Sequence, residues 1–383
     1  MIEADMKIGL VTYDFYPPIG GQGVVVHGFH EALSLMNGVQ TVVISAADNE
    51  FPDHVRIPVG TSLGAGQFVF SAKLALKMGD ISRNQRIEIL QAYGGPGGVM
   101  LLRKPDVPLV YVANHTYAQQ HRFLGKSAYR ALIKLEARGY GLADRIVAIS
   151  STTAQSLIED YGVVREKVSI IPIGVDTGLF RPLGLKRIPG SVLYAGRLCE
   201  RKGIPLLIEA IGVLAGDVPD LKLYVVGEGG LRGGLEELAS DLGIAERVVF
   251  LGKVSDEELV RWYNKVEVFA LPSLFEGFGI VCAEAMACGT PVVATHVPGV
   301  LDIIDDGRNG ILVARDPGEL SGAIARVLSK PKLRRDLGRE GIRDALERFD
   351  WESITVEFVK LYEKVLRKQA LKPGSGRDDS NFW

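Results

Sequence analysis

Two carboxylates in one short segment are the first residues of this sequence whose spacing suggests chemistry. Glu276 and Glu284 have seven residues between them in the stretch SLFEGFGIVCAEAMACGTP. An acid–base pair for glycoside hydrolysis would need its carboxyl groups about 5–9.5 Å apart across one bond. We expect Glu276 in a loop and Glu284 on the second turn of a helix that starts near Ile280, and helical geometry separates such positions by roughly 12 Å. The spacing therefore does not favour an acid and a base, and a surface position is the plain alternative, weaker for Glu284 because Ala285 and Met286 beside it are apolar.

The same segment favours binding of an anion. Gly277 and Gly279 free the backbone of this loop. The amide groups of Phe278, Gly279 and Ile280 are then expected to point outward at the start of the helix. The positive end of a helix and its unpaired amides attract phosphate groups.

A loop with two cations follows a predicted strand earlier in the chain. Arg197 and Lys202 bracket this loop, which precedes a predicted helix. Arg binds phosphate bidentately and Lys binds it as a point charge, so the pair is suited to clamping a diphosphate. The alternative is a solvated charged loop, since Glu200 and Arg201 lie in it as well.

Glycine-rich turns follow two other predicted strands. Gly20 and Gly21 open a loop whose backbone can approach a ligand, although a plain turn explains them equally well. Gly227 and Gly229 begin like a dinucleotide-binding fingerprint, but the third glycine of that motif would fall at Arg232. This removes most of the case for an NAD-dependent dehydrogenase.

Strands and helices must position these residues, and the sequence alternates between them. Short runs rich in Val and Ile are typical of parallel strands covered on both faces. Helical patterns lie between the runs, and Ser255 with Glu258 forms a capping box for one helix. The alternation predicts doubly wound α/β sheets, which bind ligands at the carboxyl ends of their strands. The expected strands are Lys7–Tyr13, Gln40–Ala46, Glu88–Ala92, Leu109–His115, Arg145–Ser150, Val168–Pro172, Ser191–Arg197, Lys222–Gly227, Val248–Gly252, Glu267–Pro272, Pro291–His296 and Gly310–Ala314.

The length of 383 residues favours two domains. The strand and helix pattern breaks over residues 173–190, which are rich in glycine and proline. We expect two Rossmann-like domains that face each other across a cleft, and a disordered C-terminal tail. The expected bounds are 1–178 for the N-terminal domain with a return helix at 351–368, 179–190 for the interdomain hinge, 191–350 for the C-terminal domain and 372–383 for the tail.

Composition excludes several other classes. Hydrophobic residues make up 47% and charged residues 23%, as in an ordinary globular protein, and the net charge of −2 gives no general attraction to nucleic acid. We find neither a signal peptide nor an apolar run long enough to span a bilayer. Cys199, Cys282 and Cys288 lack the spacing of a zinc site and indicate a reducing, cytoplasmic compartment. The sequence contains no Asp-x-Asp, so we expect no metal and no other cofactor.

Taken in order, these motifs resemble the retaining nucleotide-sugar glycosyltransferases of family four, which have the GT-B fold. The resemblance covers about residues 7–365 and rests on the ordered set, since each motif alone is weak. The sequence departs from the family pattern at His296–Asp302 and at Tyr93. The set consists of Gly20-Gly21 with His27, Asn114-His115, Gly174-Val175-Asp176 with Phe180, Arg197 with Lys202, Gly227-Glu228-Gly229, Glu276-Gly-Phe-Gly with Glu284, and Cys288-Gly-Thr-Pro291.

The resemblance implies transfer of a hexose from a UDP-sugar or GDP-sugar with retention and without a metal. It implies that Arg197 and Lys202 hold the donor diphosphate, that Glu284 binds the ribose and that Glu276 binds a hydroxyl of the sugar. His115 would lie beside the transferred sugar, so the expected catalytic residues are His115, Glu276, Arg197 and Lys202. Further donor contacts are expected from Gly20, Gly21, Gly227, Val254, Phe278, Gly279 and Ile280.

Other functions stay open beside this one. A nucleotide-sugar epimerase or hydrolase on the same fold would need a group that activates water, and none stands out. A sugar-nucleotide binding protein without turnover would keep the same donor residues, whereas a glycan phosphorylase would need a pyridoxal lysine and a longer chain. The sequence leaves the base, the sugar and the acceptor open, and the acceptor can be a lipid, a glycan or a small molecule.

A series of cations recurs every four residues in the first half of the chain. On one helix, successive members would advance by about 40° and form a slowly winding basic stripe. The stripe predicts contact with an anionic membrane or a lipid-linked acceptor. The alternative is a solvated charged face. The members are Arg122, Lys126, Arg130, Lys134 and Arg138.

Overall fold

The computed structural model describes residues 6–16, 21–48, 51–60, 66–125 and 127–371. Two compact units make up the chain, one of Met1–Pro172 with Trp351–Trp383 and the other of Ile173–Asp350. The segment expected as a hinge, 179–190, belongs to the second unit and is bonded within it. The amide of Leu183 donates to Asn264 Oδ1 at 2.7 Å, and Arg187 Nη2 donates to the carbonyl of Gly289 at 2.7 Å. The expected tail, 372–383, lies outside the described residues.

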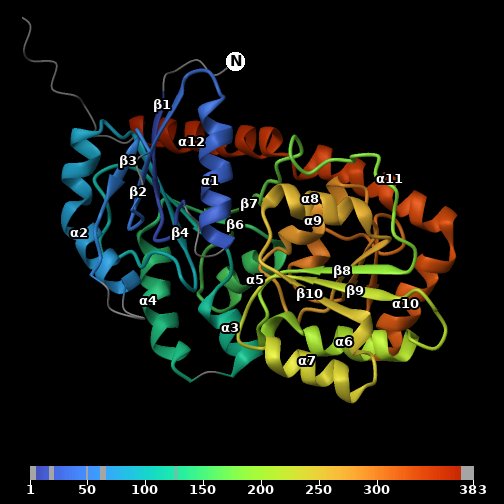
Figure 1. Ribbon diagram of the computed structural model, residues 1–383. Helices are drawn as coiled ribbons and strands as arrows, with labels where there is room; N and C mark the ends of the chain where they lie inside the picture. The colour runs from blue at the N-terminus through green and yellow to red at the C-terminus, as the bar shows by residue number, and fades with distance from the viewer. Residues whose placement is uncertain (1–5, 17–20, 49–50, 61–65, 126, 372–383) are drawn as a thin grey trace, which may run out of the picture. The chain divides into compact units, whose positions relative to one another are not determined.

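The first unit contains a seven-stranded sheet of order β3-β2-β1-β4-β5-β6-β7, in which every pairing is parallel (Figure 1). The six strands expected in this part of the chain are all present. The seventh, β3, was missed because it has three residues and no buried side chain, so its sequence carries no hydrophobic pattern. The strands are β1 (Met6–Val11), β2 (Val39–Ser45), β3 (His54–Arg56), β4 (Ile89–Gly94), β5 (Leu109–Ala113), β6 (Arg145–Ala148) and β7 (Val168–Ile170).

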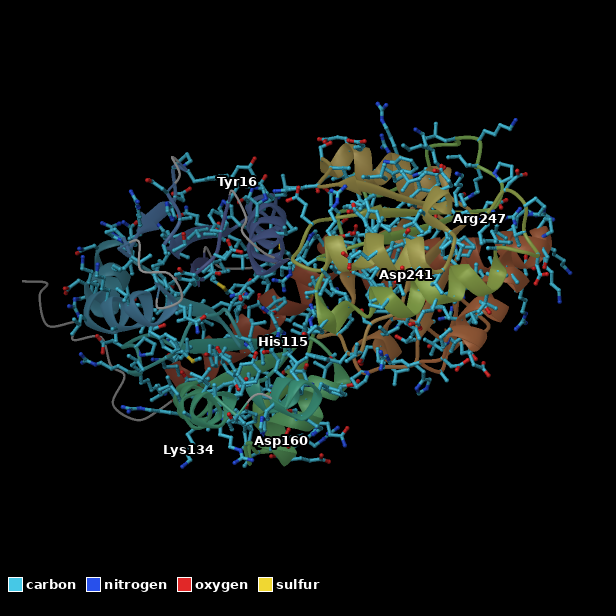
Figure 2. All side chains as sticks on the ribbon, turned by 60° about the horizontal axis from the view of Figure 1, so that its bottom comes forward. Tyr16, His115, Lys134, Asp160, Asp241 and Arg247 are labelled. Carbon is cyan, nitrogen blue, oxygen red and sulfur yellow. The ribbon has the colours of Figure 1, made fainter. Side chains whose placement is uncertain are left out.

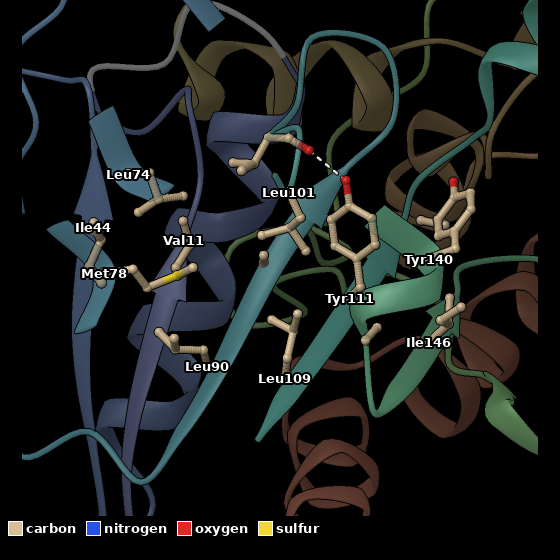
Figure 3. Close-up of a cluster of buried hydrophobic side chains, with 14 of the residues drawn as sticks. Val11, Ile44, Leu74, Met78, Leu90, Leu101, Leu109, Tyr111, Tyr140 and Ile146 are labelled. Carbon is tan, nitrogen blue, oxygen red and sulfur yellow. Dashed lines mark hydrogen bonds between the residues drawn. The ribbon is translucent and has the colours of Figure 1, made fainter. Parts of the chain in front are cut away.

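The core of this unit lies between its sheet and helices (Figure 3). Val11, Leu90 and Leu109 come from three neighbouring strands and are fully buried. Tyr111 is buried among them, and its hydroxyl donates to the carbonyl of Val99 at 2.5 Å, which satisfies both polar groups. The described helices of the unit are α1 (Gly21–Ser34), α2 (Gly66–Asn84), α3 (Tyr117–Leu124), α4 (Tyr129–Leu142), α5 (Ser151–Glu159), η1 (Arg165–Lys167) and α12 (Trp351–Ala370).

The C-terminal helix α12 packs against α1 in the first unit (Figure 1). The rings of Phe29 and Phe358 lie 4.7 Å apart between centroids. A Cβ at position 28 would come 2.7 Å from Trp351 Nε1, so Gly28 allows this close approach. Tyr362 also donates to Gln91 Oε1 of β4 at 2.5 Å. These contacts make the expected return helix part of the N-terminal unit.

The second unit repeats the plan with a six-stranded parallel sheet of order β10-β9-β8-β11-β12-β13. All six expected strands are present, and together with the first sheet they confirm the α/β fold class. The strands are β8 (Ser191–Ala195), β9 (Lys222–Val226), β10 (Val248–Gly252), β11 (Val268–Leu271), β12 (Val292–Thr295) and β13 (Gly310–Val313). The described helices are η2 (Glu200–Lys202), α6 (Ile204–Leu214), α7 (Arg232–Asp241), η3 (Ala245–Arg247), α8 (Asp256–Lys265), α9 (Ile280–Ala287), η4 (Val300–Asp302), α10 (Pro317–Ser329) and α11 (Pro331–Arg348).

The prediction of one continuous basic helix was wrong. Helix α3 ends at Leu124, and Gly125 follows it with a left-handed φ of 66°, so its amide closes the helix on the carbonyl of His121. Arg122 therefore lies on α3, whereas Arg130, Lys134 and Arg138 lie on α4, and Lys126 lies outside the described residues.

None of the helices in the described parts of the chain is long and apolar enough to cross a membrane.

Candidate functional site

The parallel sheet of the second unit brings its predicted site residues to one edge. Strand β8 pairs with β9 on one side and with β11 on the other, so the loops that leave these strands diverge at their carboxyl ends. Such a switch in strand order opens a crevice in which α/β proteins bind ligands. Arg197, Gly227, Val254 and Glu276 follow β8, β9, β10 and β11 and therefore share this edge.

A buried carboxylate joins the loops after β8 and β11. Glu276 is only 6% exposed, and Lys202 Nζ lies 2.6 Å from its Oε1. Arg201 Nη1 lies 2.7 Å from Oε2, and the Ser273 hydroxyl donates to Oε1 at 2.6 Å. Arg201 also donates to the carbonyl of Phe275 at 3.1 Å. Both oxygens of Glu276 are therefore engaged, and its charge is matched by two cations.

This environment keeps Glu276 ionised. Burial alone would raise the pKa of the Glu276 carboxyl, but the charges of Lys202 and Arg201 and the hydrogen bonds from Lys202 and Ser273 lower it to about 2. The carboxylate thus remains a hydrogen-bond acceptor throughout the neutral range.

The loops after β8 and β9 pack closely enough to require glycine. Gly227 has a φ of 125°, and a Cβ there would come 2.0 Å from the carbonyl oxygen of Gly196. The amide of Leu198 donates to the carbonyl of Glu228 at 2.9 Å, which ties the two loops together. Arg197 lies between these anchored positions with an exposed side chain, and its carbonyl accepts from the Tyr194 hydroxyl at 3.0 Å. The loop backbone is fixed while the Arg197 guanidinium faces solvent.

Helix α9 begins where the sequence predicted. Gly279 precedes it with a left-handed φ of 93°, a conformation that favours glycine, and Ile280 is its first residue. Phe278 is buried, so it anchors the loop in front of the helix. No side chain caps this end, and the first amides of a helix have no partner inside it. The start of α9 is thus suited to an anion.

Glu284 lies on α9, is 9% exposed and accepts a hydrogen bond from the Tyr263 hydroxyl on Oε2 at 2.9 Å. Burial raises the pKa of Glu284 to about 7, which the hydrogen bond from Tyr263 lowers only in part. The two glutamates of the segment therefore differ in charge at neutral pH. The structure gives them different partners, so it does not arrange them as an acid–base pair.

The first unit carries predicted residues at its own carboxyl edge. His115 follows β5, is half-buried, and its Nε2 lies 2.8 Å from Gln120 Nε2 on α3 (Figure 2). The neighbouring Asn114 Oδ1 is buried and has no hydrogen-bond partner among the described residues, as at sites where a ligand or water completes the bonding. Gly21 is exposed at the start of α1, and Gly20 lies outside the described residues.

Three residues of the site in the second unit were not identified by the sequence analysis. Arg201 stood next to Lys202 but was counted as part of a charged surface loop, although it is only 17% exposed. Ser273 precedes Glu276 by three residues, a spacing that allows a local hydrogen bond and could have marked it. Tyr263 lies 21 residues before Glu284, and no local sequence pattern predicts their contact. In the described parts of the chain, no three or more His, Cys, Asp or Glu residues are grouped as a metal would require.

Comparison with known proteins follows the same division of the chain. The family model described as Glycosyltransferase Family 4 matches residues 19–179, and that of Glycosyl transferases group 1 matches residues 179–344. The MMP alpha-(1->4)-mannosyltransferase of Mycolicibacterium hassiacum is 31% identical over 95% of this chain and 100% of its own.

Solved structures share the fold at low sequence identity. Sucrose-phosphate synthase from Thermosynechococcus elongatus superposes with a TM-score of 0.80 at 22% identity, over 95% of this chain and 100% of that one. HepE of Anabaena, solved in complex with UDP and glucose, has a TM-score of 0.73 at 20% identity, over 94% of this chain and 100% of its own. The chain belongs to the family 4 glycosyltransferases. It is a hexosyltransferase whose two parallel-sheet domains have the GT-B architecture.

The charge of Glu276 should stabilise the unliganded protein in a pH-dependent way. Its pKa is lowered in the folded state, so the stabilisation is present above the ordinary value of about 4.3 and is lost as pH falls toward 2. Glu276→Gln leaves Lys202 and Arg201 without their counter-ion and should lower the free energy of unfolding by about 2–4 kcal/mol at pH 7. Thermal melts between pH 3 and 8 should show the difference from wild type shrinking below pH 4. Glu200→Gln, next to Arg201 and Lys202 but exposed, is the control. Equal melting of Glu276→Gln and wild type at pH 7 would contradict the prediction.

Glu284 should have the opposite effect on stability. Its pKa is raised in the folded state, so folding is favoured at low pH and this contribution is lost as pH rises from about 4.3 through 7. Glu284→Gln removes the buried charge and should stabilise the unliganded protein by about 1–3 kcal/mol at pH 8 but not at pH 5. Melting temperatures at the two pH values measure this, with the exposed Glu237→Gln as the control. A lower melting temperature of Glu284→Gln at pH 8 would refute it.

Proposed function

We propose that this glycosyltransferase moves a hexose from a UDP-sugar or GDP-sugar to a lipid, glycan or small-molecule acceptor, with retention and without a metal ion. The observation that supports this best is the cluster of Lys202, Arg201 and Glu276 beside the uncapped start of α9. It combines cations, helix amides and a fixed acceptor at the edge of the sheet where ligands of α/β folds bind.

The diphosphate of the donor is assigned to the cationic part of this edge. Arg197 is exposed on an anchored loop, and the charge of Lys202 is held in place by Glu276. The amides at Gly279 and Ile280 add donors that need no rearrangement. Charge that develops on the departing diphosphate is thereby stabilised by groups already in position. These groups serve the purpose of a metal, which is why we propose transfer without one.

The nucleoside is assigned to Glu284 and the loops near Gly227 and Val254. The Tyr263 hydroxyl donates to Oε2 of Glu284, and we assign Oε1 to a ribose hydroxyl. Glu276 is assigned to a hydroxyl of the donor sugar, as an acceptor that stays charged. HepE, which shares the fold, was solved in complex with UDP and glucose, and this supports a nucleotide-sugar donor.

In the proposed reaction, the bond from the anomeric carbon to the phosphate oxygen breaks as the acceptor oxygen forms its bond on the same face. The hydroxyl proton of the acceptor passes to the departing phosphate oxygen, so no separate base is needed. The product keeps the configuration of the donor. Glu276 and Glu284 bind rather than exchange protons, which distinguishes this reaction from glycoside hydrolysis.

Helix α4 of the first unit carries three exposed cations of the expected basic stripe. Arg130, Lys134 and Arg138 are exposed there at every fourth position, and Lys134 points away from the protein (Figure 2). Arg122 on α3 pairs instead with Asp160 at 2.7 Å. We propose that the three cations of α4 contact an anionic lipid surface. We also propose that the reaction takes place in the cytoplasm, where the three free cysteines of the protein stay reduced.

The transfer is tested with a panel of UDP- and GDP-sugars and acceptor candidates, in buffer with and without EDTA. One donor should release its nucleotide only with acceptor, EDTA should leave the rate unchanged, and NMR of the product should show the donor's anomeric configuration. Arg197→Ala should lower kcat about 100-fold or more, and Glu284→Gln should raise the donor Kd about tenfold. Release without acceptor would indicate a hydrolase, and donor binding without any turnover would indicate a binding protein.

The membrane contact is tested by sedimentation with vesicles of phosphatidylcholine containing phosphatidylglycerol. Wild type should bind at low salt, and Arg130→Glu with Lys134→Glu should reduce binding about tenfold or more, since each cation near the surface contributes about 1 kcal/mol. Arg83→Glu with Lys73→Glu, on α2, is a control of equal charge change. Equal binding by the two double variants, or none by wild type, would refute the contact.

A further inference from the structure

A cavity lies in the C-terminal unit, and none of the residues that line it is assigned to the donor. Its volume of about 520 Å³ is within the range of small-molecule sites. We propose that this cavity binds a small phosphate monoester, such as a sugar phosphate. The inference goes beyond the proposed transfer and does not depend on it.

One wall of the cavity is a face of helix α11. The residues that line it recur at helical spacing, so their side chains project from the same side. Helix α11 approaches the turn after α9 closely, since a Cβ at Gly338 would come 2.6 Å from the carbonyl oxygen of Gly289. The opposite wall is the segment 182–187. The lining residues of α11 are Pro331, Arg334, Arg335, Gly338, Arg339 and Ile342.

Four arginines line this one cavity, and two of them form no ion pair with any carboxylate in the described parts of the chain. Arg187 donates to the carbonyl of Val266, to Thr290 Oγ1 at 3.1 Å and to the carbonyl of Gly289 at 2.7 Å, all of which are uncharged. For Arg335, which is exposed, neither an ion pair nor a hydrogen bond is recorded with any described residue. Neither guanidinium therefore forms an ion pair with a described carboxylate, although the charge of Glu267 acts on Arg187.

The other two arginines are paired but add to the same field. Arg334 Nη2 lies 2.9 Å from Glu267 Oε1, and Arg339 Nη2 lies 3.4 Å from Asp336 Oδ1. Burial and the nearby charge of Arg334 lower the pKa of Arg187, as expected where like charges crowd. An anion that enters would relieve this repulsion.

The start of α11 also favours an anion. Its first turn contains no acidic residue, and no side chain caps it. Cations at the positive end of a helix are unfavourable, whereas an anion there is stabilised. Arg334 and Arg335 nevertheless lie near this end and line the cavity.

The geometry selects a phosphate monoester over a bare anion. Arginine forks bind phosphate oxygens bidentately, and a dianion matches the two unpaired guanidinium groups. The volume exceeds what one phosphate group needs. Leu185 and Ile342 supply apolar surface for the carbon part of an ester.

The cavity is separate from the donor residues, although both involve α9. Cys288 and Gly289, which line the cavity, follow the last turn of this helix, whereas Gly279 and Ile280 form its start. The eight residues of the helix separate its ends by about 12 Å. The cavity lies one turn beyond Glu284 and away from the end of α9 assigned to the diphosphate, so its ligand does not take the place of the diphosphate.

Isothermal titration calorimetry of the full chain with glucose 6-phosphate tests the proposal. We expect one saturable site, no binding of glucose, and at least about tenfold weaker binding of inorganic phosphate. Arg335→Glu and Arg339→Ala should each weaken glucose 6-phosphate binding about tenfold or more, because each removes a charged hydrogen-bond donor. Both side chains are exposed, and melting curves verify that the variants fold.

Two controls separate this cavity from other phosphate-binding places. Arg326→Glu makes an equal charge change on the exposed side of α10 and should leave the affinity unchanged. Arg197→Ala alters the donor edge and should also leave it unchanged. The proposal is overturned if glucose 6-phosphate does not bind saturably, or if binding persists in Arg335→Glu and disappears in Arg197→Ala. Inorganic phosphate binding as tightly as glucose 6-phosphate would overturn the choice of an ester.

Discussion

Parallel pairing of the strands is the constraint on which both sheets depend. Consecutive parallel strands need a crossover, so all their carboxyl ends lie at one edge and their loops gather there. In the second unit, both neighbours of β8 (β9 and β11) follow it in the chain but lie on opposite sides of it, so the loops on its two sides diverge. Lys202 and Glu276 are 74 residues apart in sequence, yet they meet because their loops leave adjacent strands. The site is thus a result of strand order before it is a result of side-chain chemistry.

The pKa values of the two glutamates of the site show that the effect of burial depends on the hydrogen-bond and ion-pair partners of each carboxyl. Both are nearly inaccessible, and burial raises the pKa of each. Glu276 has two cations and a serine hydroxyl against it, which outweigh burial, whereas Glu284 has one tyrosine hydroxyl, which does not. One carboxyl is therefore ionised throughout the neutral range, and the other titrates near neutrality. Both glutamates lie four residues from Ile280, the start of α9, so their positions in the sequence do not predict the difference between their pKa values.

Much of the architecture was predictable because parallel strands carry continuous apolar runs. The twelve expected strands are present, and the start of α9 at Ile280 followed from Gly277 and Gly279. Strand β3 was not predictable, since none of its three residues is fully buried and they owe their place in the sheet to pairing with β2. The break after Leu124 depends on Gly125 adopting φ of 66°, but a glycine can also continue a helix, so the sequence leaves both outcomes open.

The partners of the site residues were less predictable than the residues themselves. Arg197, Lys202, Glu276 and Glu284 were identified from motifs, and their roles toward a donor remain predictions. Tyr263 reaches Glu284 from α8 only through tertiary packing, and a local pattern cannot encode such a contact. The segment 179–190 looked like a hinge from its glycines and prolines, but composition does not report the bonds that Leu183 and Arg187 make.

The packing of α12 on α1 gives the chain an order of assembly that differs from its order of synthesis. The second unit is continuous in sequence, whereas the first is interrupted by it and needs Trp351–Ala370 to cover Phe29 and to bond Gln91. Domains fold as units while the chain emerges from the ribosome. The unit that leaves the ribosome first is therefore completed last, and until then it presents an uncovered apolar helix face to the folding machinery of the cell.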